Sequence, residues 1–508
     1  MKKTALWLVL CLLSLYLVSC DLGTYDEEIQ TIEDEIKSMI PEAINSDYLL
    51  PVFENYQITW KIDDQIYEDT YLYQSPKMDE DLIFNVTIKR GFSSKTFEVT
   101  SKRLSLTLAN YKTSLYISMD DSISNINLDT YINMSADVIS ELNGSDQFIL
   151  NNESGRIRGR GNSTWYSYPK KPYKLKFDER VSILGMPNAK TYVLLAEYAD
   201  PSLMRNVITH ELSTYFDLRH TLETRYVDLY INNQYLGVYV LTEQVEVDKN
   251  KLDLTIDADV NDLSFLLELD MRYVDYPSVN PNAWISMNQT YYEIKDLDPE
   301  DLSYTLDYKN HIQSYLYDAY NHLISNDYQD YIDIDAWIDY MIVQEITKNV
   351  DNWYSSVYLF KDKGGLLTFG PLWDFDFAYG NVNYIEHTAV DFYGLRSDKN
   401  IWFHQMMQIP EVREKFKQRY MNFYDQYKDD FLLFINRLYM SLIDESARDD
   451  ETWDRLGLNV WPNPEEMVNA YTFQAQYNYL YQFAGTRLNW LYNAMQTDAY
   501  DLGLFDQI

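Results

Sequence analysis

The sequence predicts an α+β protein, in which a small β-sandwich precedes a larger domain with a β-rich first part and a helical second part. Two patterns predict this arrangement. Short segments that alternate apolar and polar residues, as half-buried strands do, recur from about residue 50 to residue 295. After Pro299, apolar residues recur at helical spacing instead, as in 334–349 and in most of 402–495.

The composition is acidic but typical of a folded protein. The 508 residues carry a formal net charge of −37, and 46% of them are hydrophobic, so the chain can build a large core. The length suggests about three domains. The strong negative charge disfavours nucleic acid and anionic membrane surfaces as partners, and it is compatible with a basic protein substrate.

Residues 1–20 have the pattern of a secretion signal, because two lysines precede an apolar stretch too short to span a bilayer permanently. The stretch ends in Leu17-Val18-Ser19-Cys20, which resembles the cleavage box of bacterial lipoproteins. This resemblance implies lipidation of Cys20 and attachment to the outer face of the bacterial cytoplasmic membrane. The alternative is an ordinary cleaved signal with a chance cysteine. The other cysteine, Cys11, lies inside the signal, so a mature chain would hold no disulfide.

Two segments precede the main domain, which we place at 105–500. Residues 21–47 are acidic with a short helical pattern, and we interpret them as a linker. Residues 48–104 contain alternating strands such as Phe97-Glu98-Val99-Thr100, and they resemble the small immunoglobulin-like modules of bacterial surface proteins. We expect a spacer or docking β-sandwich without chemistry of its own.

Two aspartates flank a predicted β-hairpin. Asp351 and Asp374 are 23 positions apart, and Gly364-Gly365 supplies the turn between them, so both aspartates should lie close together. From Trp373 to Phe377 aromatic residues and aspartates alternate, and in an extended chain Asp374 and Asp376 would share one face. Oxygen ligands of this kind suit Mg²⁺, Mn²⁺ or Ca²⁺. The alternative is solvated aspartates at a strand end.

A basic stretch lies far from these aspartates in the sequence. Residues 156–176 contain seven basic residues and no acidic one. They include Arg158-Gly159-Arg160-Gly161-Asn162-Ser163-Thr164, in which glycines allow backbone N–H groups to approach an anion and arginines can bind phosphate oxygens in pairs. A cationic loop facing metal-binding carboxylates is what phosphoryl transfer requires.

These stretches resemble the spore coat protein H (CotH) family of secreted, atypical protein kinases. The resemblance covers about residues 110–500 and is carried by Arg158–Trp165, Pro169–Phe177 and Trp373–Asp376. It implies a two-lobed, protein-kinase-like domain with a β-rich N-lobe and a helical C-lobe. Its implied activity is transfer of the ATP γ-phosphoryl group to Ser or Thr of an exported protein, with Mg²⁺ or another divalent ion.

The resemblance also implies roles for single residues. Asp351 would accept or orient the hydroxyl proton, Asp374 would hold the metal ion, and Asp376 would assist it. One lysine of the strand 173–177 would neutralise phosphates and be held by a helical glutamate, with Glu197 as the competing candidate. Glu243 would contact the base at the hinge. The expected nucleotide-binding residues are Arg158, Arg160, Asn162, Lys174, Lys176, Glu211 and Glu243.

One position departs from the kinase pattern. Kinase catalytic loops place an Asn about five residues after the aspartate as a second metal ligand, whereas this chain has Ser356. Two alternatives therefore stay open: a non-catalytic surface lipoprotein with a degenerate kinase fold, acting as an adhesion or scaffold module, and transfer to a small molecule or glycan.

Overall fold

The computed structural model describes residues 26–45, 47–109, 112–142, 145–255, 262–274, 281–296, 306–393 and 399–497. The predicted signal with Cys20 lies outside these ranges. The chain divides into two compact units, Met1–Leu106 with Glu141–Gln147, and Thr107–Ser140 with Phe148–Ile508. Among the described residues, none of the helices combines the length and the apolarity that crossing a bilayer requires.

The first unit is built on a five-stranded sheet with the order β1-β7-β6-β3-β4. Along β6, Leu82, Phe84, Val86 and Ile88 are buried in alternation, as their period of two requires for a sheet with one covered face. The strands are β1 (Ala43–Ile44), β3 (Gln57–Ile62), β4 (Gln65–Tyr67), β6 (Glu80–Arg90) and β7 (Ser93–Arg103), with β2 (Tyr48–Leu49) and β5 (Thr70–Tyr71) forming a separate pair.

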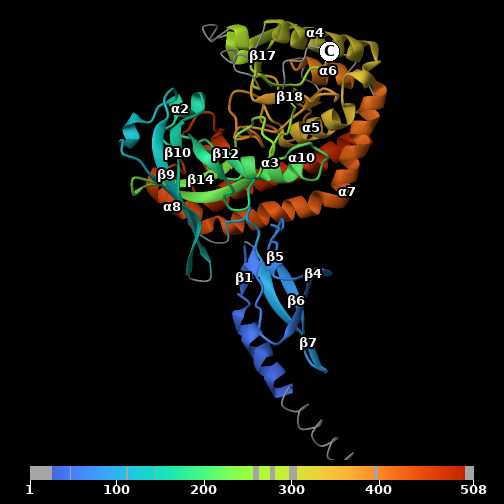
Figure 1. Cartoon of the computed structure of the whole chain (residues 1–508). Helices are drawn as coiled ribbons and strands as arrows, with labels where there is room; N and C mark the ends of the chain where they lie inside the picture. Colours follow the sequence, from blue (N-terminus) through green and yellow to red (C-terminus); the bar gives the residue numbers. More distant parts are fainter. Residues whose placement is uncertain are drawn as a thin grey trace, which may run out of the picture. The chain divides into compact units, whose positions relative to one another are not determined.

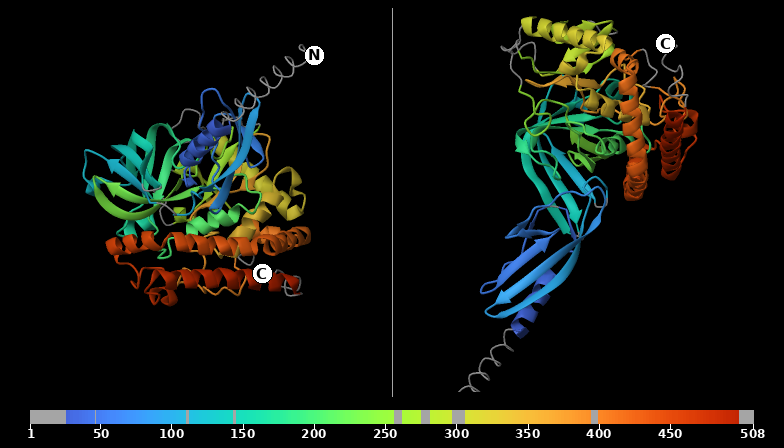
Figure 2. Two further views of the ribbon diagram at one scale, coloured as in Figure 1. Left: turned by 90° about the horizontal axis from the view of Figure 1, so that it is seen from below. Right: turned by 90° about the vertical axis from the view of Figure 1, so that its right-hand side faces the viewer.

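A helix over residues 26–39 packs on this sheet (Figure 1 and Figure 2). Ile29, Ile36 and Ile40 share one core with Trp60 and Phe84 of the strands, because their helical spacing gives the helix one apolar face. The acidic segment is therefore part of a packed unit from residue 26 on, and its predicted helical pattern is confirmed. The sheet is likewise covered by a helix, where we expected a β-sandwich.

The second unit begins with a closed seven-stranded barrel of the order β10-β11-β12-β14-β13-β8-β9. In β11, Tyr173, Leu175 and Phe177 point into the barrel core while Lys174 and Lys176 lie on the other face, as the alternation predicts. The strands are β8 (Thr113–Ser118), β9 (Ile132–Leu142), β10 (Ser145–Gly159), β11 (Tyr173–Val181), β12 (Ala189–Leu195), β13 (Thr224–Ile231) and β14 (Gln234–Glu243).

A second sheet and a set of helices complete this unit. The sheet has the order β16-β17-β15-β18-β19, with β15 (Phe265–Leu269), β16 (Trp284–Met287), β17 (Thr290–Ile294), β18 (Val357–Lys361) and β19 (Thr368–Phe369). Strand β15 pairs with β17, and the predicted β18–β19 hairpin is confirmed. The mixed α+β class is confirmed as well.

The helices build the largest core together with this sheet. They are α2 (Ser163–Ser167), α3 (Arg205–Ser213), α4 (Leu306–Ser325), α5 (Ile334–Thr347), α6 (Ile401–Met407), α7 (Pro410–Ser441), α8 (Ile443–Trp453), α9 (Glu465–Val468) and α10 (Phe473–Gln496). The long helices α7 and α10 run side by side (Figure 2).

Helix α3 begins at Arg205, four residues after Pro201, although proline favours the first turn of a helix. The reason is the Asp200 carboxylate, which accepts the backbone N–H groups of Ser202, Met204 and Arg205 at 2.9, 3.1 and 2.8 Å. These bonds form a turn that caps the helix from outside its first residue.

A buried ion pair joins the basic stretch to α8. Lys170 Nζ lies 2.6 Å from Asp449 Oδ1, and both side chains are 0% exposed. Lys170 also donates to the carbonyl of Val238 at 2.6 Å, while Asp449 accepts the N–H of Val238 at 2.8 Å and pairs with Arg455. Burial lowers the pKa of Lys170 to about 8. Burial would raise the pKa of Asp449, but Lys170 and Arg455 together hold it below its ordinary value.

This pair predicts a large loss of stability on removal of either partner. Lys170→Ala leaves Asp449 buried with one cation fewer, which costs about 3–5 kcal/mol. Lys176→Ala, which removes an exposed lysine of the same stretch, should stay within about 0.5 kcal/mol of the wild type. Urea denaturation followed by tryptophan fluorescence measures both. Equal midpoints for the two variants would contradict a structural role for Lys170.

Candidate functional site

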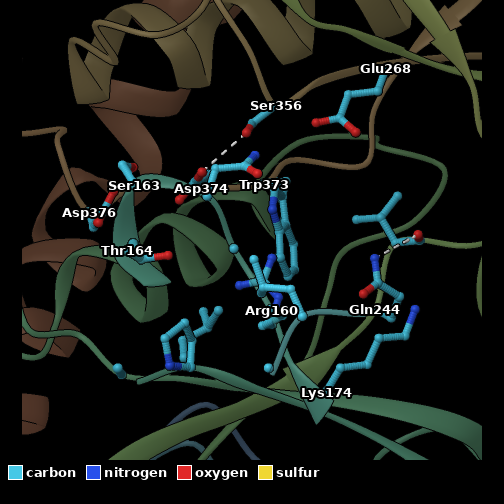
Figure 3. A pocket seen from close by; sticks show the side chains of 18 of the residues that line it. Arg160, Ser163, Thr164, Lys174, Gln244, Glu268, Ser356, Trp373, Asp374 and Asp376 are labelled. Carbon is cyan, nitrogen blue, oxygen red and sulfur yellow. Dashed lines mark hydrogen bonds between the residues drawn. The ribbon is translucent and has the colours of Figure 1, made fainter. Parts of the chain in front are cut away.

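A cavity of about 600 Å³ brings the two stretches singled out in the sequence together. Its wall includes residues 158–164 at the end of β10 and Lys174 of β11, and it also includes Trp373, Asp374 and Asp376. Figure 3 shows Arg160 beside the ring of Trp373, with Asp374 and Asp376 on one side and Lys174 on the other. The basic loop and the aspartates therefore face one space, although about 200 residues separate them in the sequence.

The local backbone requires glycine in the basic loop. Gly161 has a φ of +82°, and a Cβ there would lie 2.2 Å from the Thr164 hydroxyl oxygen. A Cβ on Gly159 would lie 2.5 Å from the ring of Trp165. Small residues at both positions thus let the loop fold tightly enough to present Arg158 and Arg160 to the cavity.

The cations on this side of the cavity are not neutralised. Arg158 lies opposite Lys174 in the β10–β11 register, and its guanidinium donates to the carbonyl of Leu128 at 3.0 Å. Arg160 stacks on Trp373 with 5.1 Å from its guanidinium carbon to the ring centroid. Within the described part of the chain, the side chains of Arg160 and Lys174 make no hydrogen bond and no ion pair.

The pKa values reflect this crowding of positive charge. Burial lowers the pKa of Lys174 to about 8, and Arg158 and Arg160 contribute to the shift while Glu246 opposes it. Burial also lowers the pKa of Arg160, although Asp374 acts against the shift. An anion bound here would relieve the repulsion among these three cations.

On the other side of the cavity, the carboxylates crowd negative charge together. Burial and the charge of Asp374 raise the pKa of Asp376 well above its ordinary value. Among the described residues neither aspartate has an ion-pair partner. The Ser356 hydroxyl donates to Asp374 Oδ2 at 3.1 Å. Trp373 and Phe375, which alternate with the aspartates, are buried, but the segment is not extended, because Asp374 has a φ of +69°.

Asp351 follows α5 and lies beside the cavity, outside the residues that line it. Burial raises its pKa to about 7, and the charge of Asp374 adds to this shift. Asp351 and Asp374 are therefore close enough to interact electrostatically, as the hairpin between them predicts. Ser356, which stands where kinases have an asparagine, has a φ of +63° and lines the cavity.

Asn162 lines the cavity with Arg158, Arg160 and Lys174, whereas three other predicted nucleotide contacts do not reach it. Lys176 is exposed on the same face of β11 but beyond the wall. Glu211 is buried on α3 and lies 3.5 Å from the Thr214 hydroxyl. Glu243 accepts the N–H of Glu223 at 3.0 Å, and the following residue, Gln244, lines the cavity instead.

A group of charged residues in the cavity was missed by the sequence reasoning. Lys295 lies 3.1 Å from Glu268 and 2.6 Å from Glu293, and Arg272 lies 2.5 Å from Asp270. Burial would lower the pKa of Lys295, but Glu268 and Glu293 raise it above its ordinary value. The signal in the sequence was Glu268 itself, a charge inside the apolar strand β15 that must have a partner when buried.

Glu197 also lines the cavity, at the end of β12. It has a φ of +49°, and its carboxylate accepts the amide of Asn206 at 3.0 Å. Burial raises its pKa to about 8, with Asp200 contributing. Glu197 was the competing candidate to Glu211, and of these two glutamates only Glu197 reaches the cavity.

The residues of the cavity can share a metal ion with a ligand but cannot enclose one alone. Among the described residues, no group of three or more His, Cys, Asp and Glu side chains is arranged to hold a metal ion. Asp374 and Asp376 supply two carboxylates. Mg²⁺ is commonly held in this way, by one or two carboxylates together with phosphate oxygens and water.

Comparison with known proteins gives one family. A family model described as CotH kinase protein matches residues 157–491, which is more than half of the chain and contains both walls of the cavity. A search of curated proteins returned no match.

The raised pKa of Glu197 predicts a pH-dependent stability difference for Glu197→Gln. The folded-state pKa of about 8 lies above the ordinary value of 4.5, so the wild type loses stability as the pH rises from about 4.5 to 8. Glutamine keeps an acceptor for Asn206 but never ionises. The variant should therefore be more stable than the wild type at pH 9, by on the order of 2–4 kcal/mol in the free energy of unfolding, and the difference should be smaller at pH 5. Calorimetry in EDTA measures this; a difference independent of pH would contradict it.

Proposed function

The chain belongs to the CotH kinase protein family, and from this membership and the geometry of the cavity we propose that it transfers the γ-phosphoryl group of ATP to a serine or threonine hydroxyl of a protein. One observation carries the proposal. Two cations, Arg160 and Lys174, face two carboxylates, Asp374 and Asp376, across one cavity, and none of the four forms an ion pair within the described ranges of the chain. The phosphates of a nucleotide and a divalent cation would neutralise both sets at once.

The donor set fits a divalent ion such as Mg²⁺ or Mn²⁺. Asp374 and Asp376 would hold it, since two carboxylates that face one cavity repel each other unless a cation lies between them. When bound, the ion would supply positive charge to the phosphate oxygens. Ser356 supports the site by fixing the Asp374 carboxylate through its hydrogen bond.

The other residues would bind and orient the reactants. Arg158, Arg160 and Lys174 would neutralise the phosphates, with Arg160 kept in place by its stack on Trp373. Asp351 would accept the proton of the acceptor hydroxyl, for which its raised pKa makes it a stronger base than an ordinary aspartate. Catalysis would thus consist mainly of positioning and charge neutralisation.

In this proposal the barrel corresponds to the β-rich lobe of a kinase, and the second sheet with its helices corresponds to the helical lobe. The order of parts supports it, since the hairpin β18–β19 separates Asp351 from Asp374. We further propose export and a lipid anchor at Cys20 on the outer face of the bacterial cytoplasmic membrane. The acceptor would be an exported, basic, Ser/Thr-rich protein and not nucleic acid, which the net charge of −37 supports.

The metal-binding role predicts that Asp374→Asn abolishes transfer without unfolding the chain. The amide removes one of the two negative charges, so the initial rate with ATP, Mn²⁺ and a basic protein should fall by about 100-fold or more. Asp429→Asn, on an exposed side chain of α7, is the matched control and should keep full activity.

Incorporation of ³²P into the acceptor measures both variants, and circular dichroism checks their folding. If Asp374→Asn kept the rate of the control, the assignment of Asp374 would fail. If the wild type transferred nothing with any divalent ion, the non-catalytic scaffold would replace the kinase.

The raised pKa of Asp351 predicts the pH profile of the reaction. Only the carboxylate form accepts a proton, so kcat should rise with pH and level off above the pKa of Asp351, which is about 7 without a metal ion. A cation at Asp374 cancels one cause of the shift and should move the inflection below 7. Asp351→Asn should lose both the rate and the inflection. A profile that falls between pH 5 and 7 would contradict the role as base.

A further inference from the structure

A single buried amide ties together three segments of the cavity wall. Asn206 lies in the first turn of α3, is 4% exposed and lines the cavity. Its Nδ2 donates to Glu197 Oε1 at 3.0 Å, and its Oδ1 accepts the backbone N–H of Phe375 at 2.7 Å. Phe375 stands between Asp374 and Asp376. Asn206 therefore holds the backbone between both carboxylates of the site.

The segment needs such a hold. Two neighbouring carboxylates repel each other, and Asp374 has a left-handed backbone, with a φ of +69°, that residues with a Cβ adopt uncommonly. A neutral amide can fix this backbone without adding another charge. A glutamate or lysine at the same place would change the charge balance of the cavity.

The amide itself is held from both sides. Glu197 accepts from Nδ2, which sets the orientation of the amide and turns Oδ1 toward Phe375. The carbonyl of Glu197 accepts from Arg455 at 3.0 Å, which fixes the residue. Beside Asn206, Arg205 donates to the carbonyl of Ala378 at 3.0 Å, so α3 also binds the backbone just after Asp376.

We propose that Asn206 is a positioning residue, oriented by Glu197, that holds Asp374 and Asp376 at the separation needed to bind a divalent cation. The proposal rests on the proposed function in one respect, the assignment of those two aspartates to the metal ion. Helix α3 thus contributes the amide of Asn206 to the site, whereas we expected it to contribute Glu211 as the partner of a lysine.

The test measures binding of Mn²⁺ to the full chain by isothermal titration calorimetry in the presence of a non-hydrolysable ATP analogue, because the two carboxylates would share the ion with phosphate oxygens. Asn206→Ala should weaken Mn²⁺ binding about 10- to 100-fold, the usual effect of removing a residue that orients metal ligands. Asn436→Ala is the control, because it removes a similar side-chain amide contact elsewhere. Asn436 lies on α7, and its amide donates to the hydroxyl of Tyr477 on α10 at 2.9 Å. It should leave Mn²⁺ binding unchanged.

A double variant separates positioning from general damage. Asn206→Asp with Glu197→Gln exchanges donor and acceptor between the two positions, since the new glutamine donates and the new aspartate still accepts from Phe375. It should bind Mn²⁺ more tightly than Asn206→Asp alone. The comparison of the double variant with Asn206→Asp tests the proposal even if Asn206→Ala does not fold.

Wild-type Mn²⁺ affinity in Asn206→Ala, or no gain in the double variant over Asn206→Asp, would overturn the proposal. Failure of the proposed function looks different. If Asp374→Asn also binds Mn²⁺ like the wild type, the metal assignment of the aspartates is wrong, whatever Asn206 does.

Discussion

The position of the cationic loop depends on the buried pair of Lys170 and Asp449. Two charges with no exposed surface are stable only when each faces the other and its remaining bonds are made, and here Val238 and Arg455 complete the set. The pair fixes the end of the loop against β14 and α8. Lys171 adds to this by donating to the carbonyl of Tyr168 at 2.5 Å. Two basic residues of the stretch are thus structural and hold the loop that carries Arg160.

Charge separation inside the cavity follows from that fixed loop. Arg160 lies half-buried on Trp373, and Asp374 accepts a hydrogen bond from Ser356. The Glu268–Lys295 pair, in contrast, is closed within the second sheet. The cavity therefore contains both satisfied charges, which shape its wall, and unsatisfied ones, which are available to a ligand.

Local patterns predicted much of the fold and part of the site. Alternation in β11 assigned Lys174 to the face opposite the barrel core, and the Gly364-Gly365 turn joined the strands between Asp351 and Asp374. Both signals act over a few residues. The family motifs then connected the two distant stretches, which no local pattern does.

The sequence did not predict contacts between distant residues, or which of two neighbouring residues faces the cavity. The start of α3 depends on the side chain of Asp200, which a helical pattern does not reveal. Glu243 and Gln244 differ by one position, yet only the second faces the cavity, because neighbouring residues of a strand point in opposite directions. The helix over residues 26–39 packs on a sheet whose strands come later in the sequence. Its apolar spacing alone therefore did not show whether the helix packs on another element.

The backbone at Ser356 bears on which residues this position accepts. A φ of +63° is unfavourable for serine by about 1 kcal/mol, whereas asparagine adopts it more readily. The amide that kinase loops carry about five residues after the aspartate would therefore fit this main chain with less strain than the serine does.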